Sequence, residues 1–292
     1  MKFGVMFANS GPFATSEGAE AMARAAEDAG FESLWTVEHV VVPAGYESEY
    51  PYDKSGKMPG GDEIDIPDPF VWLAYVAGLT SEIELATGIV IANQRNPLIT
   101  AKEVATLDRL SGGRMLYGVG VGWLEEEFRA LGVPFERRGA RLDEYLEATR
   151  ALWAEPRASY HGEFVDFTDA ISRPQPAGGS VPIHIGGHTE PAARRAGRLG
   201  DGFFPARGND ERLRELIAIA HATALEHGRD PEAIEITTGG AAAFAPDPVA
   251  ALRELEAGVG VHRVVIPPLS FDPREIGAAL GRFGDDVIAK VG

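Results

Sequence analysis

Residues 83–121 read IELATGIVIANQRNPLITAKEVATLDRLSGGRMLYGVGV. Two apolar, β-branched runs flank a segment of helical period, which predicts a strand, a helix and a second strand. Asn96 and Pro97 suit the start of the helix, because an amide side chain caps free N–H groups and proline needs no N–H partner there. Gly112 lies where the helix should end. We expect the three elements at 83–91, 98–110 and 114–121.

The same alternation of strand and helix runs along the whole chain. The other strands are expected at 2–8, 33–37, 181–186, 201–205, 234–244 and 261–266. The other helices are expected near 16–29, 69–79, 140–154, 190–198, 210–227, 248–257 and 274–289. Eight such units in 292 residues favour an α/β fold, a closed (β/α)8 TIM barrel, over an open Rossmann sheet. No linker divides the chain, so residues 1–292 are expected to form a single domain.

Two segments interrupt the alternation. Residues 43–67 are rich in Pro and Gly and follow the second predicted strand. A loop of this length inside a compact domain is usually functional. Residues 159–176 resemble a small hairpin before the fifth predicted strand. We expect both segments to be insertions on the barrel.

Composition excludes several classes of protein. The chain carries 27 Lys and Arg against 44 Asp and Glu, a formal net charge of −17. Nucleic acids and anionic membranes are polyanions, so we expect neither as the main partner. The absence of Cys excludes disulfides, Fe–S clusters and cysteine nucleophiles. The longest apolar run, Phe70–Leu79, is far below the roughly 18 residues of a membrane span, and the N-terminus lacks a signal peptide pattern. We therefore expect a cytoplasmic protein.

A histidine follows the second predicted strand, where the sequence reads Glu38-His39. Active sites of TIM barrels lie at the C-terminal ends of the strands. A histidine there can transfer a proton near neutral pH, and a carboxylate lies beside it in the sequence. An ordinary loop histidine is the alternative reading. No metal is expected, because the sequence contains neither HxH nor HExxH.

The third predicted strand carries signs of a ligand. Thr87 and Gly88 inside a strand suggest a bulge or the close approach of another group to the backbone. Asn93 opens a polar stretch that we expect at the rim of the barrel. An ordinary capped turn would explain the polar stretch equally well.

The fourth predicted strand continues the pattern. Its glycines, Gly118, Gly120 and Gly122, recur with a period of two and therefore share one face. Without side chains this face would leave space for a flat ring, with Trp123 directly after it. Tight core packing is the alternative.

The fifth predicted strand ends in Gly186-Gly187-His188, directly before a helix. Exposed N–H groups and the positive end of the helix dipole suit an anion, with phosphate the natural guest. Arg207, after the sixth predicted strand, could reach the same phosphate. A plain turn with a threonine cap is the alternative.

Four stretches of the chain resemble the luciferase-like monooxygenase superfamily, and within it the branch that uses the deazaflavin coenzyme F420. They are KFGVMF at 2–7, SLWTVEH at 33–39, TGIVIANQRNPLITAKEVATLDRLSGGRMLYGVGVGW at 87–123 and PIHIGGHTEPAARRAGRLGDGFFPA at 182–206. The resemblance implies a TIM barrel that binds its flavin or deazaflavin ring at the C-terminal mouth. It also implies hydride transfer between the ring and a small organic substrate.

The resemblance assigns roles to individual residues. It implies that Thr87-Gly88 forms a bulge, often with a non-proline cis peptide, that backs the ring. Gly120 and Gly122 match glycines beside the ring, and Gly186 and Gly187 match the loop that holds the cofactor phosphate. His39 matches a catalytic acid or base, with Glu38 expected to tune it.

The chain also departs from the family pattern. Several dehydrogenase members have Asp where Glu38 stands, and sugar-phosphate dehydrogenases have a proton-transferring Glu where Trp123 stands. These departures favour a reductase, or an orphan oxidoreductase, over the oxidation of a sugar phosphate or an alcohol of that type. Two alternatives stay open, an FMN-dependent two-component monooxygenase and a barrel that binds flavin without turnover. A homodimer is expected, as is common in the family.

Overall fold

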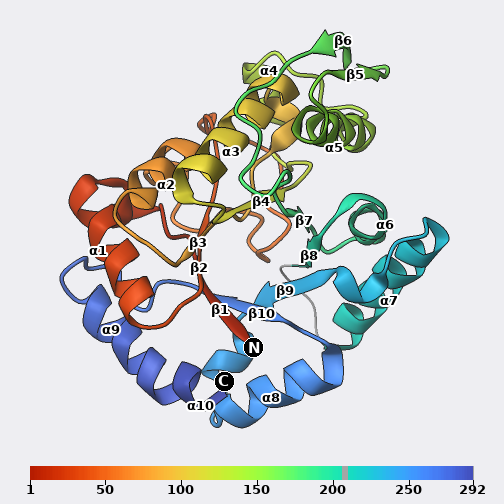
Figure 1. Ribbon diagram of the computed structural model, residues 1–292. Coiled ribbons are helices and arrows are strands. Elements are labelled where there is room, and N and C mark those ends of the chain that lie inside the picture. The colour runs from red at the N-terminus through yellow and green to blue at the C-terminus, as the bar shows by residue number, and fades with distance from the viewer. Residues whose placement is uncertain (206–209, 292) are drawn as a thin grey trace.

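The computed structural model describes residues 1–205 and 210–291. Eight parallel strands close into a barrel in the order β1-β10-β9-β8-β7-β4-β3-β2 (Figure 1). The predicted (β/α)8 barrel is thereby confirmed. The barrel strands are β1 (Lys2–Met6), β2 (Ser33–Thr36), β3 (Glu84–Thr87), β4 (Met115–Val119), β7 (Ile183–Gly186), β8 (Gly202–Phe204), β9 (Glu235–Gly239) and β10 (Arg263–Ile266).

The helices form a ring around the barrel (Figure 1). Asp68, Asn96 and Asp247 each accept backbone N–H groups in the first turn of a helix that begins with proline, as their Asx-Pro pairs indicate. The helices that follow the barrel strands are α1 (Ser16–Asp28), α2 (Pro69–Ala77), α3 (Pro97–Ser111), α5 (Arg138–Ala154), α6 (Glu190–Leu199), α7 (Asp210–Glu226), α8 (Pro248–Val259) and α9 (Ile276–Phe283).

Both predicted insertions are present. Residues 43–67 run as turns and irregular coil between β2 and α2. The hairpin consists of the antiparallel strands β5 (Ala158–His161) and β6 (Asp166–Ala170), which lie beyond α5 at the top of Figure 1. The sequence did not indicate the short helix α4 (Glu125–Ala130) after β4.

Some predicted boundaries were wrong. β3 ends at Thr87 instead of residue 91, and beyond it the chain pairs with β4 through a bridge between Val90 and Val119. The peptide bond between Gly88 and Ile89 is cis. The strand expected at 234–244 ends at Gly239 and passes into a 3-10 turn. The last helix begins at Ile276 and becomes a π-helical turn after Phe283.

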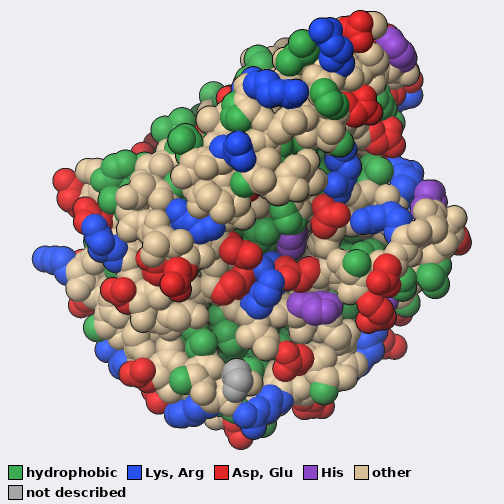
Figure 2. All heavy atoms as spheres, viewed as in Figure 1, with side chains coloured by type: hydrophobic (Ala, Val, Ile, Leu, Met, Phe, Trp, Pro, Cys, Tyr) green, Lys and Arg blue, Asp and Glu red, His purple; other side chains and the backbone are tan. Residues whose placement is uncertain are grey.

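A charged cluster closes the N-terminal end of the barrel, which we call the floor. Arg263, at the start of β10, is fully buried and pairs with Glu32, Glu84 and Glu235. Its Nη2 donates to Glu84 at 2.9 Å, and its guanidinium lies 5.5 Å from the Trp35 ring inside the barrel. Figure 2 shows acidic side chains gathered at the centre of the face that carries the N-terminus. Burial raises the pKa of Glu84 to about 8.

Above the floor, a small apolar cluster fills the barrel. It is separate from the main core, which lies between the strands and the helices. Its buried members come from five strands and are Trp35, Ala86, Leu116, Phe204 and Val265. No helix in the described part of the chain is long and apolar enough to cross a membrane.

Candidate active site

His39 lies directly after β2 at the mouth of the barrel, the C-terminal end of its strands. Its Nδ1 is 3.0 Å from Oε2 of Glu127 on α4. The other oxygen of Glu127 accepts the backbone N–H groups of Val40 at 2.6 Å and Val41 at 3.3 Å. The Glu127 side chain is 0% exposed and that of His39 is 11% exposed. The mouth therefore contains a buried carboxylate–imidazole pair.

Glu127 was not among the residues that the sequence singled out. The only signal was the run Glu125-Glu126-Glu127 after the glycines of β4. Three carboxylates in the first turn of a helix suit its dipole, so the run is explained without function. The sequence cannot show which of the three turns toward His39.

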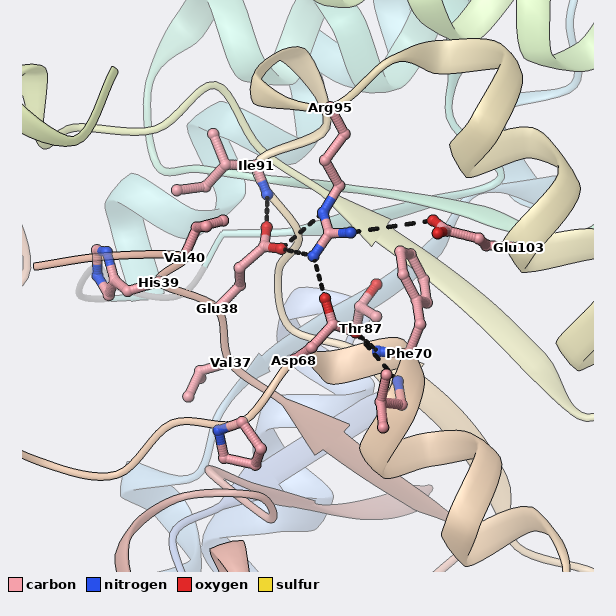
Figure 3. Close-up of polar contacts among 12 residues, drawn as sticks. Val37, Glu38, His39, Val40, Asp68, Phe70, Thr87, Ile91, Arg95 and Glu103 are labelled. Carbon is pink, nitrogen blue, oxygen red and sulfur yellow. Dashed lines mark hydrogen bonds and ion pairs between the residues drawn. The ribbon is translucent and has the colours of Figure 1, made fainter. Parts of the chain in front are cut away.

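Glu38 lies beside His39 in the sequence but points elsewhere (Figure 3). Its buried carboxylate accepts the Ile91 N–H at 2.6 Å and pairs with Arg95, whose Nε is 2.7 Å away. Arg95 also pairs with Asp68 at 2.6 Å. Burial raises the pKa of Glu38, although Arg95 opposes the rise. The Glu38 carboxylate therefore holds the loop after β3 and does not contact the His39 ring, and its expected tuning of His39 stays a prediction.

A cavity of about 320 Å³ adjoins His39. This volume is at the lower end of the range for small-molecule sites, about 300–1,000 Å³. Its wall is partly apolar and partly charged. The lining residues are Glu38, His39, Val40, Ile66, Asp68, Pro69, Gln94, Arg95 and Leu131.

The glycines of β4 do not leave an empty slab. A Cβ on Gly120 would lie 2.7 Å from Ile89 Cδ1, and one on Gly122 would lie 2.7 Å from the Phe128 ring. A Cβ on Gly186 would lie 2.6 Å from Ile89 Cγ2. The expected open face was therefore wrong, and tight packing is the correct reading. Gly120 and Gly186 make room for Ile89, which is left half-buried at the mouth.

The polar side chains of Thr87 and Asn93, in and after β3, donate hydrogen bonds to backbone carbonyls. Thr87 is buried and its hydroxyl donates to the Gly118 carbonyl at 2.7 Å. Asn93, which was expected at the rim, is buried. Its amide donates to the carbonyls of Arg138 at 2.9 Å and Val121 at 3.4 Å. Gly88 packs against Trp35, with 3.0 Å from its ideal Cβ position to the indole.

Aromatic rings from the 43–67 insertion form a wall across the mouth. Trp123 meets the rings of His39, Tyr46 and Tyr50 edge-on, with centroids 5.7, 5.5 and 5.3 Å away. Tyr52 lies between Tyr50 and His188, with centroids 5.3 and 4.9 Å away. The wall thus joins the end of β4 to the loop after β7.

Glu126 fastens the insertion to α4. One oxygen accepts the backbone N–H groups of Glu47 at 2.8 Å and Ser48 at 3.1 Å, and the other accepts the Ser48 hydroxyl at 2.7 Å. These hydrogen bonds, that from the Ser48 hydroxyl first, lower the pKa of Glu126 to about 2. The insertion and the His39 loop are therefore held by consecutive carboxylates of one helix.

The proposed phosphate loop is built differently from expectation. The N–H of Gly187 donates to the Phe204 carbonyl of β8 at 3.1 Å, so it is not free for an anion. Gly187 has a φ of +126°, which a glycine adopts most readily. Thr189 caps α6 by accepting the Ala192 N–H, as predicted. Arg207 lies outside the described residues.

The sequence of this chain is similar to those of known proteins. The profile of the family described as luciferase-like monooxygenase matches residues 1–278. An uncharacterised protein of Mycobacterium bovis is 38% identical over 63% of this chain and 66% of its own length. An F420-dependent glucose-6-phosphate dehydrogenase of Segniliparus rotundus is 34% identical over 64% of this chain and 57% of its own length.

One solved structure extends the likeness to the whole chain. The monooxygenase RslO1 from Streptomyces bottropensis is 25% identical, with a TM-score of 0.79 and complete coverage of both chains. The two curated relatives named above, in contrast, are matched over 66% and 57% of their own length. The match of the family profile to nearly the entire barrel is decisive, and this chain belongs to the luciferase-like monooxygenase family.

Proposed function

We propose that this protein is an F420-dependent oxidoreductase that transfers a hydride between bound deazaflavin and a small organic substrate. The observation that carries the proposal is the His39–Glu127 pair at the barrel mouth, beside a cavity of about 320 Å³. Such a pair can exchange the proton that accompanies hydride transfer to or from a carbonyl group. The similarity to an F420-dependent dehydrogenase supports the choice of cofactor.

The residues at the mouth fit a flat ring. Ile89 is braced from behind by Gly120 and Gly186 and leaves a half-buried apolar surface. Trp123 and Tyr50 stand at the side of the mouth where His39 lies. The deazaflavin, when bound, supplies or accepts the hydride, and the protein orients it and excludes water.

The phosphate of the cofactor would lie at the start of α6. The first N–H groups of a helix have no partner within the helix, so those of Thr189 and Glu190 suit an anion. His188 borders the same point through its contact with Tyr52. Gly187 shapes this turn, and its own N–H remains with Phe204.

His39 would hold or release the proton through Nε2, since Nδ1 faces Glu127. The adjoining cavity limits the substrate to a small molecule, and its apolar members Val40, Ile66 and Leu131 suit the carbon skeleton. The substrate would therefore be a small carbonyl compound or the corresponding alcohol.

A second candidate is an FMN-dependent monooxygenase that receives reduced flavin from a separate reductase. The likeness to a monooxygenase over the complete chain favours it. The Ile89 surface and the start of α6 would serve FMN equally well, because both cofactors carry a flat ring and a phosphate.

Equilibrium binding of oxidised F420 and of FMN to the same purified protein separates these candidates. We expect tight binding of F420 and weaker binding of FMN, followed by hydride transfer from reduced F420 to a small carbonyl acceptor. Preference for FMN, with oxygen consumption in the presence of reduced FMN and a substrate, would move the assignment to the monooxygenase. Binding of either cofactor without turnover would leave a binding protein, and binding of neither would contradict the proposal.

We also propose that the protein is a homodimer, as is common in the family. The neighbouring helices α2 and α3 expose apolar side chains on their outer faces, Val71 and Tyr75 on one and Ile99 and Leu110 on the other. Sedimentation equilibrium is expected to give about twice the chain mass of 31.2 kDa for the wild type. Replacing Val71 and Ile99 by Lys should shift the protein to monomer, whereas replacing Leu225 by Lys on α7 should not. A monomeric wild type would contradict this proposal.

A further inference from the structure

The two oxygens of Glu127 have different partners. Oε1 accepts two backbone N–H groups, from Val40 and Val41, and Oε2 faces His39 Nδ1. The carboxylate is fully buried, so solvent cannot replace any of these partners. Both backbone groups are donors and cannot turn around, which fixes the orientation of the Glu127 side chain. An acceptor oxygen is therefore held against Nδ1.

We infer that Glu127 is a positioning residue that fixes the tautomer of His39, with the proton on Nδ1 and the lone pair on Nε2. A carboxylate is an acceptor only, so the ring nitrogen that faces it must carry the proton. Within residues 1–205 and 210–291, Nε2 has no hydrogen-bond partner. Nε2 is thus the nitrogen left for a substrate oxygen, and it can accept a proton from an alcohol or return one to a carbonyl.

Trp123 packs its ring edge-on against His39, with centroids 5.7 Å apart, and limits the rotation of the imidazole. The His39 imidazole is therefore held by Glu127 at Nδ1 and by the Trp123 ring at its side.

Glu127→Gln tests the inference. The two backbone donors should keep the amide oxygen in place of Oε1, because the amide NH2 group cannot accept from them. The NH2 group then faces Nδ1 and donates to it. The tautomer is reversed, with Nδ1 as acceptor and the proton on Nε2. The same type of substitution in a serine protease lowers kcat about 10⁴-fold by selecting the wrong tautomer.

The direct measurement is the 15N NMR spectrum of the imidazoles in the protein without substrate, at alkaline pH where they are neutral. The His39 signals are identified by their loss in a His39→Asn variant. In the wild type we expect a protonated Nδ1 and an unprotonated Nε2, and in Glu127→Gln the reverse. A proton on Nε2 of the wild type would overturn the inference. This outcome is read from the wild-type spectrum, and the His39→Asn variant serves to identify the signals.

Kinetics supply the second measurement, which rests on the proposed function. Glu127→Gln should lower kcat about 10²–10⁴-fold with little change in KM and in F420 affinity. Glu126→Gln is the matched control, since Glu126 lies next in the chain but holds Glu47 and Ser48. It should keep the wild-type imidazole signals. Unchanged signals in Glu127→Gln would overturn the inference, whereas normal NMR results without F420 binding would refute only the proposed function.

Discussion

His39→Ala is expected to lower the rate of hydride transfer by about 10²–10⁴-fold, the usual contribution of a general acid or base. The affinity for F420 should be nearly unchanged. The proposed cofactor surface consists of Ile89, Trp123 and the start of α6. Trp123 loses its ring contact with His39 but keeps those with Tyr46 and Tyr50, so it should stay in place. Stopped-flow absorbance of the deazaflavin measures the rate, and fluorescence titration measures the affinity.

The fold should tolerate this substitution. Removing the imidazole leaves the Glu127 carboxylate with two of its three hydrogen-bonded partners, the N–H groups of Val40 and Val41. His161→Ala is the control, because His161 lies on the exposed hairpin and pairs there with Asp166. It should behave like the wild type. An equal loss of rate and of F420 affinity in His39→Ala would contradict a catalytic role for His39.

Periodicity and local chemistry in the sequence predict the strands and the helix caps. The eight strands follow from runs of β-branched residues, and the caps at Asp68, Asn96 and Asp247 follow from local chemistry. Once the barrel was recognised, the position of His39 after β2 followed too, since strand ends meet at one mouth.

Side-chain direction could not be predicted. Glu38 and His39 are neighbours in the sequence, but one carboxylate turns to Arg95 and the imidazole turns to Glu127, 88 residues away along the chain. The glycines in and after β4 indicated close approach correctly, but the approaching groups are Thr87 at Gly118, Ile89 at Gly120 and Phe128 at Gly122, and not a ligand. A glycine pattern shows that space is needed, and only the structure shows what occupies it.

The two ends of the barrel use carboxylates in opposite ways. At the mouth, Glu127 is paired with a group that can lose its charge, so the pair can exchange a proton. At the floor, Glu32, Glu84 and Glu235 surround Arg263, whose guanidinium stays charged at any pH the protein meets. The floor is therefore a structural cluster, and its removal should affect folding more than chemistry.

Arg263→Met should destabilise the protein by about 3–5 kcal/mol at neutral pH, the usual result of removing one partner from a buried ion pair. Methionine keeps the unbranched apolar part of the side chain but removes the guanidinium that contacts Trp35, and it leaves Glu32, Glu84 and Glu235 without their common cation. Urea denaturation measures the free energy of unfolding. Arg274→Met is the control, since Arg274 is 89% exposed and solvent screens its pair with Asp272, so the free energy of unfolding should barely change.

The destabilisation caused by Arg263→Met should depend on pH. Because burial raises the pKa of Glu84 from 4.5 to about 8, the folded protein holds a proton between these values that the unfolded chain has released. The free energy of unfolding therefore falls as the pH rises from 4.5 to about 8 and levels off above that. In Arg263→Met the positive charge that lowers the pKa of Glu84 is gone, so the fall should continue to higher pH and the destabilisation should be smaller in acid. Adding Glu84→Gln should restore part of the lost stability at alkaline pH, because an amide needs no cation. If Arg263→Met lowers the free energy of unfolding equally at every pH, or no more than Arg274→Met does, then ion pairing does not stabilise the floor.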